Sequence, residues 1–354
     1  MNDVKVFFLT SHYERSYINF LNATSGALLF HSLEYRNLLI DALGKSSQDK
    51  YIIATIDEKV VGALPLFCNT RSAPNGIINS LPFYGSHGGL LIRDGFDVDF
   101  IGRKILNYAL DYFYSGDFLS FNIVDNPFDS RAELFEEVLQ KKKSDYRVSQ
   151  YTRLPVKERD RISIERALMD QFHSKTRNMV RKAAREGFIC QVGNMEAFGK
   201  GIYDLHVANM EKISGKAKPP HFFKAVSNHF SVNRDYRVYL ALKNGEMAAG
   251  LLLFYYKDFC EYFTPVISEK YRNRQPLSFL IMNAMCDCVE RGIKIWNWGG
   301  TWPSSQEGVY LFKKRWGAEE LEYNYYTITK DSQLLHDSLS TLVEENKYYY
   351  IAKF

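Results

Sequence analysis

The chain has 354 residues, which is more than one ordinary hydrophobic core accommodates, so two domains are expected. Hydrophobic residues make up 46% and charged residues 24%, which excludes a disordered chain, and a net charge of +4 is too small for a dedicated nucleic-acid-binding protein. No apolar run approaches the roughly 20 residues that span a bilayer, and residues 1–5 do not open a secretion signal. We therefore expect a cytoplasmic protein without stable membrane insertion.

The five cysteines are scattered, which fits a reducing compartment, and no His/Cys/Asp cluster has metal-ligand spacing. Cys286 and Cys288 are two residues apart in an apolar stretch, so their side chains do not face each other. We expect both in the core, and no metal cofactor.

One pattern occurs twice along the chain. Residues 51–62 and 239–250 each read as strand, tight turn, strand, with Tyr, Glu and Gly at matching positions. The flanks repeat as well. A helix precedes each hairpin (33–43 and 222–230), and a longer helix follows it (100–114 and 276–290). Each longer helix ends at a glycine, Gly116 or Gly292, and leads into a buried-looking strand (118–124 and 293–298). The pattern predicts an α/β fold of two similar domains with mixed sheets. The alternative is one large sheet with chance similarity.

The domain boundary is expected where the sequence becomes polar, charge-rich and weakly periodic, near residues 150–165. We therefore predict an N-terminal domain over 1–155 and a C-terminal domain over 156–354.

A glycine-rich loop is expected at residues 81–89, Leu-Pro-Phe-Tyr-Gly-Ser-His-Gly-Gly. Tyr84, Ser86 and His87 would supply polar groups to a ligand that approaches the backbone closely. A structural turn within the first domain explains the glycines equally well. His87 has no visible Ser or Cys partner, which argues against a role as general base.

A basic helix is predicted over residues 174–187, with Ser174 as its N-cap and Gly187 as its stop. Arg177, Arg181 and Arg185 recur every four residues and share one face. Arginines in such a row suit phosphate or carboxylate. A solvated basic face is the other interpretation.

The second long helix begins at Pro276 after a basic stretch, Tyr-Arg-Asn-Arg-Gln, from residue 271. Basic residues before a helix start can hold a pyrophosphate, although a solvated helix entry would look the same. The residues that could hold a cofactor here are Arg272, Arg274, Gln275 and Ser278.

The most specific stretch is residues 293–317, which read as a strand, the turn Gly299–Thr301 and a short helix that ends at Gly317. A strand that stops at this turn would leave free backbone N–H groups, where an anionic or carbonyl ligand can bind. Lys313 on the short helix could bring a positive charge to the same place.

These motifs resemble a known family. The repeated unit resembles a duplicated GNAT acyltransferase fold, and residues 175–187, Gly299–Thr301 and Phe312–Gly317 resemble the FemAB-like branch of that superfamily. The resemblance implies transfer of an acyl or aminoacyl group onto an amine. Members of the branch add amino acids from aminoacyl-tRNA to a peptidoglycan precursor, and others are acetyltransferases linked to envelope polysaccharide.

The resemblance also implies site residues. Phe312 and Lys313 match the family's Phe-Lys pair, whose lysine stabilises negative charge in the transferring ester, and Arg36 would lie near the acceptor. We expect Lys313, Gly300 and Thr301 at the catalytic centre, and Arg36, Tyr84, His87, Arg177, Arg181, Asn297, Tyr310 and Phe312 at the substrate. The chain departs from the family in lacking a long helical-hairpin insertion and a clean Gln/Arg-x-x-Gly-x-Gly/Ala loop for coenzyme A.

Together these observations predict an N-acyltransferase that moves an acyl group from acyl-CoA to an amine of a small-molecule or glycan precursor of the cell envelope or a polysaccharide. Backbone N–H groups would polarise the carbonyl; no general base is assigned. One alternative is an aminoacyl-tRNA-dependent transferase acting on a peptidoglycan precursor, with tRNA on the arginine face. Another is a non-catalytic module that binds a phosphorylated glycan or nucleotide. Residues 118–128 lack Gly-Gly-Thr and Phe-Lys, so chemistry is expected in the second domain.

Overall fold

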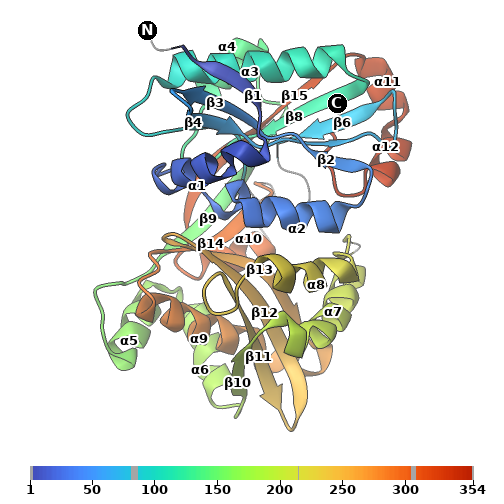
Figure 1. Ribbon diagram of the computed structural model, residues 1–354. Coiled ribbons are helices and arrows are strands. Elements are labelled where there is room, and N and C mark those ends of the chain that lie inside the picture. Colours follow the sequence, from blue (N-terminus) through green and yellow to red (C-terminus); the bar gives the residue numbers. More distant parts are fainter. Residues whose placement is uncertain (1–2, 81–86, 214, 304–307, 353–354) are drawn as a thin grey trace. The chain divides into compact units, whose positions relative to one another are not determined.

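The computed structural model describes residues 3–80, 87–213, 215–303 and 308–352. Its contacts form two compact units: unit 1 comprises residues 1–147 and 321–354, and unit 2 comprises residues 148–320 (Figure 1). The compact units thus differ from the continuous ranges 1–155 and 156–354 expected from the sequence, since residues 321–354 pack with the beginning of the chain. The limits of the two repeated domains stay a prediction.

Unit 1 contains two sheets. Their strands are β1 (Lys5–Phe8), β2 (Ser47–Asp49), β3 (Ile52–Ile56), β4 (Lys59–Leu64), β5 (Phe67–Asn69), β6 (Gly76–Asn79), β7 (Leu91–Ile92), β8 (Phe118–Val124) and β15 (Glu319–Thr329). The order is β1-β3-β4-β7 in one sheet and β15-β8-β6-β5-β2 in the other, where β6 and β8 are parallel and the other neighbours are antiparallel.

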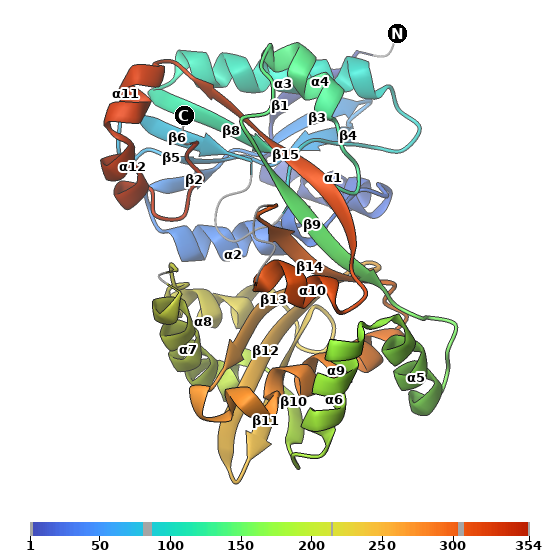
Figure 2. The same ribbon diagram turned by 180° about the vertical axis from the view of Figure 1, so that it is seen from behind.

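Helices cover both faces of these sheets. They are η1 (Ser11–Tyr13), α1 (Glu14–Asn22), η2 (Leu29–His31), α2 (Leu33–Leu43), α3 (Val98–Ser115), α4 (Ala132–Leu139), α11 (Ser332–Asp337) and α12 (Leu339–Glu345). The apolar face of α3, with Ile105 and Phe113, packs on β3, β4 and β8. On the other face, α11 and α12 lie beside β5 and β6 in both views (Figure 2).

Unit 2 contains one mixed sheet in the order β10-β11-β12-β13-β14-β9. Its strands are β9 (Asp145–Arg153), β10 (Ile189–Gly193), β11 (Tyr236–Lys243), β12 (Glu246–Tyr256), β13 (Phe259–Ile267) and β14 (Ile295–Thr301), and its helices are α5 (Arg161–Gln171), α6 (Ser174–Ala184), α7 (Met195–Lys212), α8 (Pro220–His229), η3 (Glu269–Arg274), α9 (Pro276–Glu290) and α10 (Val309–Lys314). Helices α5, α6 and α9 lie on one face of the sheet, and α7 and α8 lie on the other (Figure 1).

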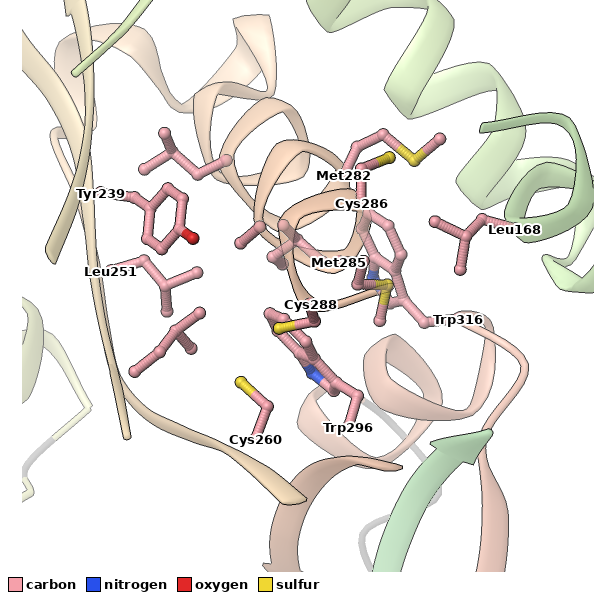
Figure 3. Close-up of a cluster of buried hydrophobic side chains, with 14 of the residues drawn as sticks. Leu168, Tyr239, Leu251, Cys260, Met282, Met285, Cys286, Cys288, Trp296 and Trp316 are labelled. Atoms are coloured by element: carbon pink, nitrogen blue, oxygen red, sulfur yellow. The ribbon is translucent and has the colours of Figure 1, made fainter. Parts of the chain in front are cut away.

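The two faces of β12 show why the strand is apolar along its whole length. Leu251 and Leu253 point toward α9, where Figure 3 shows Trp296 and Trp316 among the sulfur side chains of that helix. Phe254 points to the opposite face, and its ring lies 4.8 Å from that of Phe230 at the end of α8. A strand buried on both faces loses the alternation of polar and apolar residues.

The structure confirms the α/β class and most of the expected elements. The helices at 33–43 and 276–290 and the strand at 118–124 have the expected limits, and Cys286 and Cys288 are buried in the core. Ser174 is wrong as an N-cap, because His173 takes that place and its Nδ1 accepts from the Lys175 N–H at 3.1 Å. The strand expected at 293–298 runs instead over Ile295–Thr301.

Gly317 ends the α10 segment in a conformation that other residues adopt with strain. Its φ is +74°, and a Cβ there would lie 3.0 Å from the carbonyl oxygen of Gln171. We expect Gly317→Ala to lower the free energy of unfolding by about 1–3 kcal/mol, measured by urea denaturation. Gly292→Ala is the matched control, since φ there is +77° but no atom lies within 4 Å of the added Cβ. An equal loss in both variants would show that backbone strain, and not the contact with Gln171, sets the cost.

Candidate functional site

The parallel strands β13 and β14 separate in the middle of the unit 2 sheet. Their register pairs run from Phe259↔Ile295 to Glu261↔Asn297. Beyond this point β13 remains paired with β12 up to Ile267, and β14 remains paired with β9 up to Thr301. The separation exposes the edges of two adjacent strands to each other, and unpaired strand edges offer N–H and C=O groups to a ligand.

A buried carboxyl group lies where the two strands separate. Asn297 Nδ2 is 2.9 Å from Glu261 Oε2 and 3.2 Å from Oε1, and both side chains are buried. Burial raises the pKa of Glu261 to about 8, although the hydrogen bond from Asn297 acts in the opposite direction. Glu261 therefore changes its charge near neutral pH, as a catalytic acid or base requires.

Lys313 lies at the far end of β14. It projects from α10 and is 6% exposed, and its Nζ donates to Thr301 Oγ1 at 2.9 Å, Gly300 O at 3.2 Å and Gly299 O at 3.4 Å. Among the described residues no carboxylate forms an ion pair with it. Burial lowers its pKa to about 7. Lys313 thus contacts all three residues of the Gly-Gly-Thr segment, and the sequence had predicted that these residues lie together.

The backbone of this segment differs from the expectation in one respect. We expected the strand to stop at Gly299 and leave free N–H groups, but β14 continues to Thr301 in register with β9. Gly299, with φ of +73°, lies at an irregularity in that pairing, and its N–H donates to Asn297 Oδ1 at 2.9 Å. That N–H is therefore occupied, and the Asn297 amide connects it to Glu261.

A hydrogen-bond network connects Lys313 to β9. Thr301 Oγ1, which accepts from Lys313, donates to Gln150 Oε1 at 3.1 Å, and Gln150 Nε2 donates to the Tyr310 carbonyl oxygen at 3.2 Å. Phe312 packs against Trp298, with ring centroids 6.2 Å apart. The structure thus brings together the sequence-predicted residues Asn297, Gly300, Thr301, Tyr310, Phe312 and Lys313.

Sequence reasoning missed Glu261 and Gln150. Glu261 is the charged residue in Phe-Cys-Glu-Tyr-Phe, a stretch that otherwise reads as a buried strand. A carboxylate there is costly unless it is paired or protonated, so the position was a recognisable signal. Gln150 gave no such signal, because glutamine is common on exposed strand faces.

A second buried lysine, Lys218, lies on the α7–α8 face. It is 6% exposed, and burial lowers its pKa to about 7. Its Nζ lies 5.1 Å from the ring centroid of Phe263, which shares a face of β13 with Glu261. The α7–α8 face of the diverging strands therefore carries both Glu261 and a titratable amine.

The expected cofactor residues at the start of α9 do not converge. Arg272 Nε donates to Glu269 at 2.8 Å, and Arg274 lies 3.3 Å from Glu186. Gln275 precedes the helix with φ of +61°, and Ser278 is buried with its Oγ 3.4 Å from Gln275 Oε1. Both guanidinium groups are thus already paired with carboxylates, and η3 fills the turn before the helix.

The arginine face of α6 is divided in the structure. Arg177 is partly buried, and its Nη1 donates to the Phe172 carbonyl oxygen at 2.6 Å. Arg181 and Arg185 are exposed and line a hollow of about 390 Å³ with Lys182. The exposed pair is open to an anion, whereas Arg177 holds the turn before its own helix.

The remaining predicted substrate residues belong to unit 1. Arg36 Nη2 donates to Glu14 at 2.6 Å and its Nε lies 3.8 Å from Asp49, so its charge is balanced locally. His87 is fully buried, and its ring contacts those of Phe30, Phe128 and Tyr323. Tyr84 lies outside the described residues. A substrate role for these three residues stays a prediction.

Across the described parts of the chain, no helix has the length and apolar character needed to cross a membrane. In the same residues, no group of three or more His, Cys, Asp or Glu side chains could hold a metal ion.

Comparisons with known proteins agree with this architecture. The family described as "Acetyltransferase (GNAT) domain" matches residues 171–314. Crystal structures with a similar fold include FemX (TM-score 0.68, 13% identity, 94% of this chain and 98% of that one) and a tandem GNAT protein from the clavulanic acid biosynthesis pathway (0.59, 13%, 92% and 98%). Another is the C-terminal domain of a putative lysylphosphatidylglycerol synthetase from Agrobacterium fabrum (0.54, 11%, 94% and 97%). A search of curated proteins finds no significant match.

Residues 171–314 thus match a GNAT acetyltransferase domain, and the fold of the chain, with its diverging strands, is that of two GNAT-like domains.

Proposed function

We propose that this chain transfers an acyl group from acyl-CoA to an amine of a cell-envelope or polysaccharide precursor, at the separation of β13 and β14 in unit 2. The observation that carries the proposal is Lys313, a buried lysine held by the Gly-Gly-Thr segment at the end of β14. The choice of acceptor follows the sequence resemblance to FemAB-like proteins.

The reaction needs a neutral amine, a held thioester and a group that takes a proton. The amine nitrogen attacks the carbonyl carbon, the C–N bond forms and the C–S bond breaks. Coenzyme A leaves as its thiolate, which then takes up the proton that the amine lost and becomes the thiol. The Lys313 ammonium would stabilise the oxyanion, because a preorganised charge in a buried site acts strongly on developing charge. Glu261 in its carboxylate form would accept the proton that the attacking amine loses.

A second donor, aminoacyl-tRNA, is favoured by two observations. Arg181, Lys182 and Arg185 form an exposed basic surface on α6, while Arg272 and Arg274 are paired with carboxylates where a coenzyme A pyrophosphate was expected. Binding of tRNA to the α6 surface should weaken steeply with salt, because phosphate contacts release counterions.

The test is to incubate the purified chain with a panel of amino sugars, their nucleotide derivatives and a peptidoglycan precursor, together with either acetyl-CoA or charged tRNA. We expect an acylated amine, detected by mass spectrometry, with acetyl-CoA. If a product forms with charged tRNA but not with acetyl-CoA, the acyl donor is aminoacyl-tRNA and not acyl-CoA. Ligand binding without any product from either donor would favour a non-catalytic module.

A further inference from the structure

Strands β6 and β8 of unit 1 repeat the arrangement of β13 and β14. Each pair is parallel and joined through a long helix, α3 or α9, and each is flanked by antiparallel strands, β5 and β15 in one unit and β12 and β9 in the other. The last register pair is Asn79↔Asn122 in unit 1 and Glu261↔Asn297 in unit 2. The two polar pairs therefore occupy equivalent positions.

In unit 1 this position binds the main chain of residue 350. Asn79 Nδ2 and Asn122 Nδ2 each lie 3.2 Å from the carbonyl oxygen of Tyr350. Thr327 Oγ1 donates to Asn122 Oδ1 at 2.8 Å, which turns the amide nitrogen of Asn122 toward Tyr350. Both asparagines are fully buried. Two carboxamides thus hold one peptide carbonyl where Asn297 holds Glu261 in unit 2.

The residues around this carbonyl are bound as those of a peptide ligand are. Ile351 is buried in a cluster with Ile77 and Leu119 of the strands. The Tyr350 ring lies 4.6 Å from that of Tyr325, and its hydroxyl donates to Asp145 at 3.2 Å. The segment therefore combines a carbonyl held by two side-chain amides, a packed ring and an apolar side chain in a buried cluster.

We propose that residues 347–352 act as an intramolecular ligand, and that they occupy a binding position in unit 1 for an extended molecule that carries a secondary amide. This position accepts such a molecule when the segment is displaced. The amide carbonyl of the incoming ligand takes the place of the Tyr350 carbonyl between Asn79 and Asn122, and an apolar group takes the place of Ile351. A peptide and the pantetheine arm of coenzyme A share this amide chemistry.

The test compares the full chain with a variant that lacks residues 347–354. The variant keeps Asn346, whose Nδ2 donates to Ser72 Oγ at 3.1 Å and holds the end of α12. Isothermal titration calorimetry is carried out with two probes, an octapeptide of the sequence of residues 347–354 and coenzyme A. We expect the truncated variant to gain one site relative to the full chain, for the octapeptide if the site recognises a peptide and for coenzyme A if it recognises pantetheine.

The matched control is Asn79→Ala in the truncated variant, which should weaken the added site about 10-fold through loss of one buried hydrogen bond. If the truncated variant does not fold, Ile351→Asp in the full chain serves instead, because it removes the apolar anchor and keeps the chain length. A folded variant that gains no site for either probe would overturn the proposal, as would an added site that Asn79→Ala leaves unchanged. Acyl transfer in unit 2 could fail its own test without affecting this result.

Discussion

Replacing Lys313 by alanine is expected to lower the turnover number of acyl transfer about 100-fold while the chain remains folded. The ammonium group lies among Gly299 O, Gly300 O and Thr301 Oγ1, all uncharged acceptors, so its positive charge is not cancelled by an ion pair among the described residues. The charge is therefore available to an oxyanion at the end of β14. Steady-state kinetics gives the turnover number, and far-ultraviolet circular dichroism checks the fold.

Lys314→Ala is the matched control. Lys314 is the next residue of the same helix, but it is exposed and forms an ion pair with Glu320 at 3.1 Å. Its removal should change the turnover number less than twofold, because exposed ion pairs contribute little and Lys314 pairs with Glu320 and not with the Gly-Gly-Thr segment. Equal activity in the two variants would remove Lys313 from the mechanism, and a pronounced loss of structure in Lys313→Ala would assign it a structural role.

Much of the fold follows from the periodicity of apolar residues and from the prolines and glycines at the ends of helices and strands. The helix at Pro276–Glu290 has a proline at its first position and a glycine two residues past its end, and both limits were correct. The strand at Phe118–Val124 could be placed because it is apolar throughout and follows Gly116. The compact units could not be predicted, because the return of residues 321–354 to unit 1 depends on long-range strand pairing such as that of Tyr325 with Val124.

The candidate site was predictable to a similar degree. The sequence placed Lys313 beside Gly299–Thr301, since a strand, a glycine turn and a short helix bring these residues together. It did not place Asn297 against Glu261, because these residues lie on separate strands and their contact depends on the parallel register. For the same reason the sequence could not show that Asn79 and Asn122 hold Tyr350.

Replacing Glu261 by glutamine is expected to lower the turnover number on the order of 100-fold, because glutamine cannot accept a proton. In the unchanged enzyme Glu261 becomes a carboxylate near pH 8 and Lys313 loses its positive charge near pH 7, so the rate should rise to a maximum between these values and then fall. The variant should lack this rise. An unchanged pH profile in Glu261→Gln would mean that another group accepts the proton.

The same substitution should have the opposite effect on stability, and this outcome does not depend on the substrate. The pKa of Glu261 is raised from 4.5 to about 8 in the folded chain, so between these values the folded state holds a proton that the unfolded state has released. The free energy of unfolding of the unchanged protein should therefore fall by up to about 1.4 kcal/mol per pH unit over that range through this group. Glutamine removes this loss, so we expect the variant to gain stability relative to the unchanged protein between pH 5 and pH 8, measured by urea denaturation.

Glu269→Gln is the control for that comparison. Glu269 is exposed, and its hydrogen bonds with Lys212 and Arg272 lower its pKa, so its replacement should show no such gain at pH 8. If the difference in the free energy of unfolding between Glu261→Gln and the unchanged protein is the same at pH 5 and pH 8, Glu261 ionises as an ordinary carboxylate. It then cannot be a base with a pKa near neutral pH. A gain in stability together with a loss of turnover would instead show that the chain keeps a costly buried carboxyl group at the point where β13 and β14 separate because the reaction uses it.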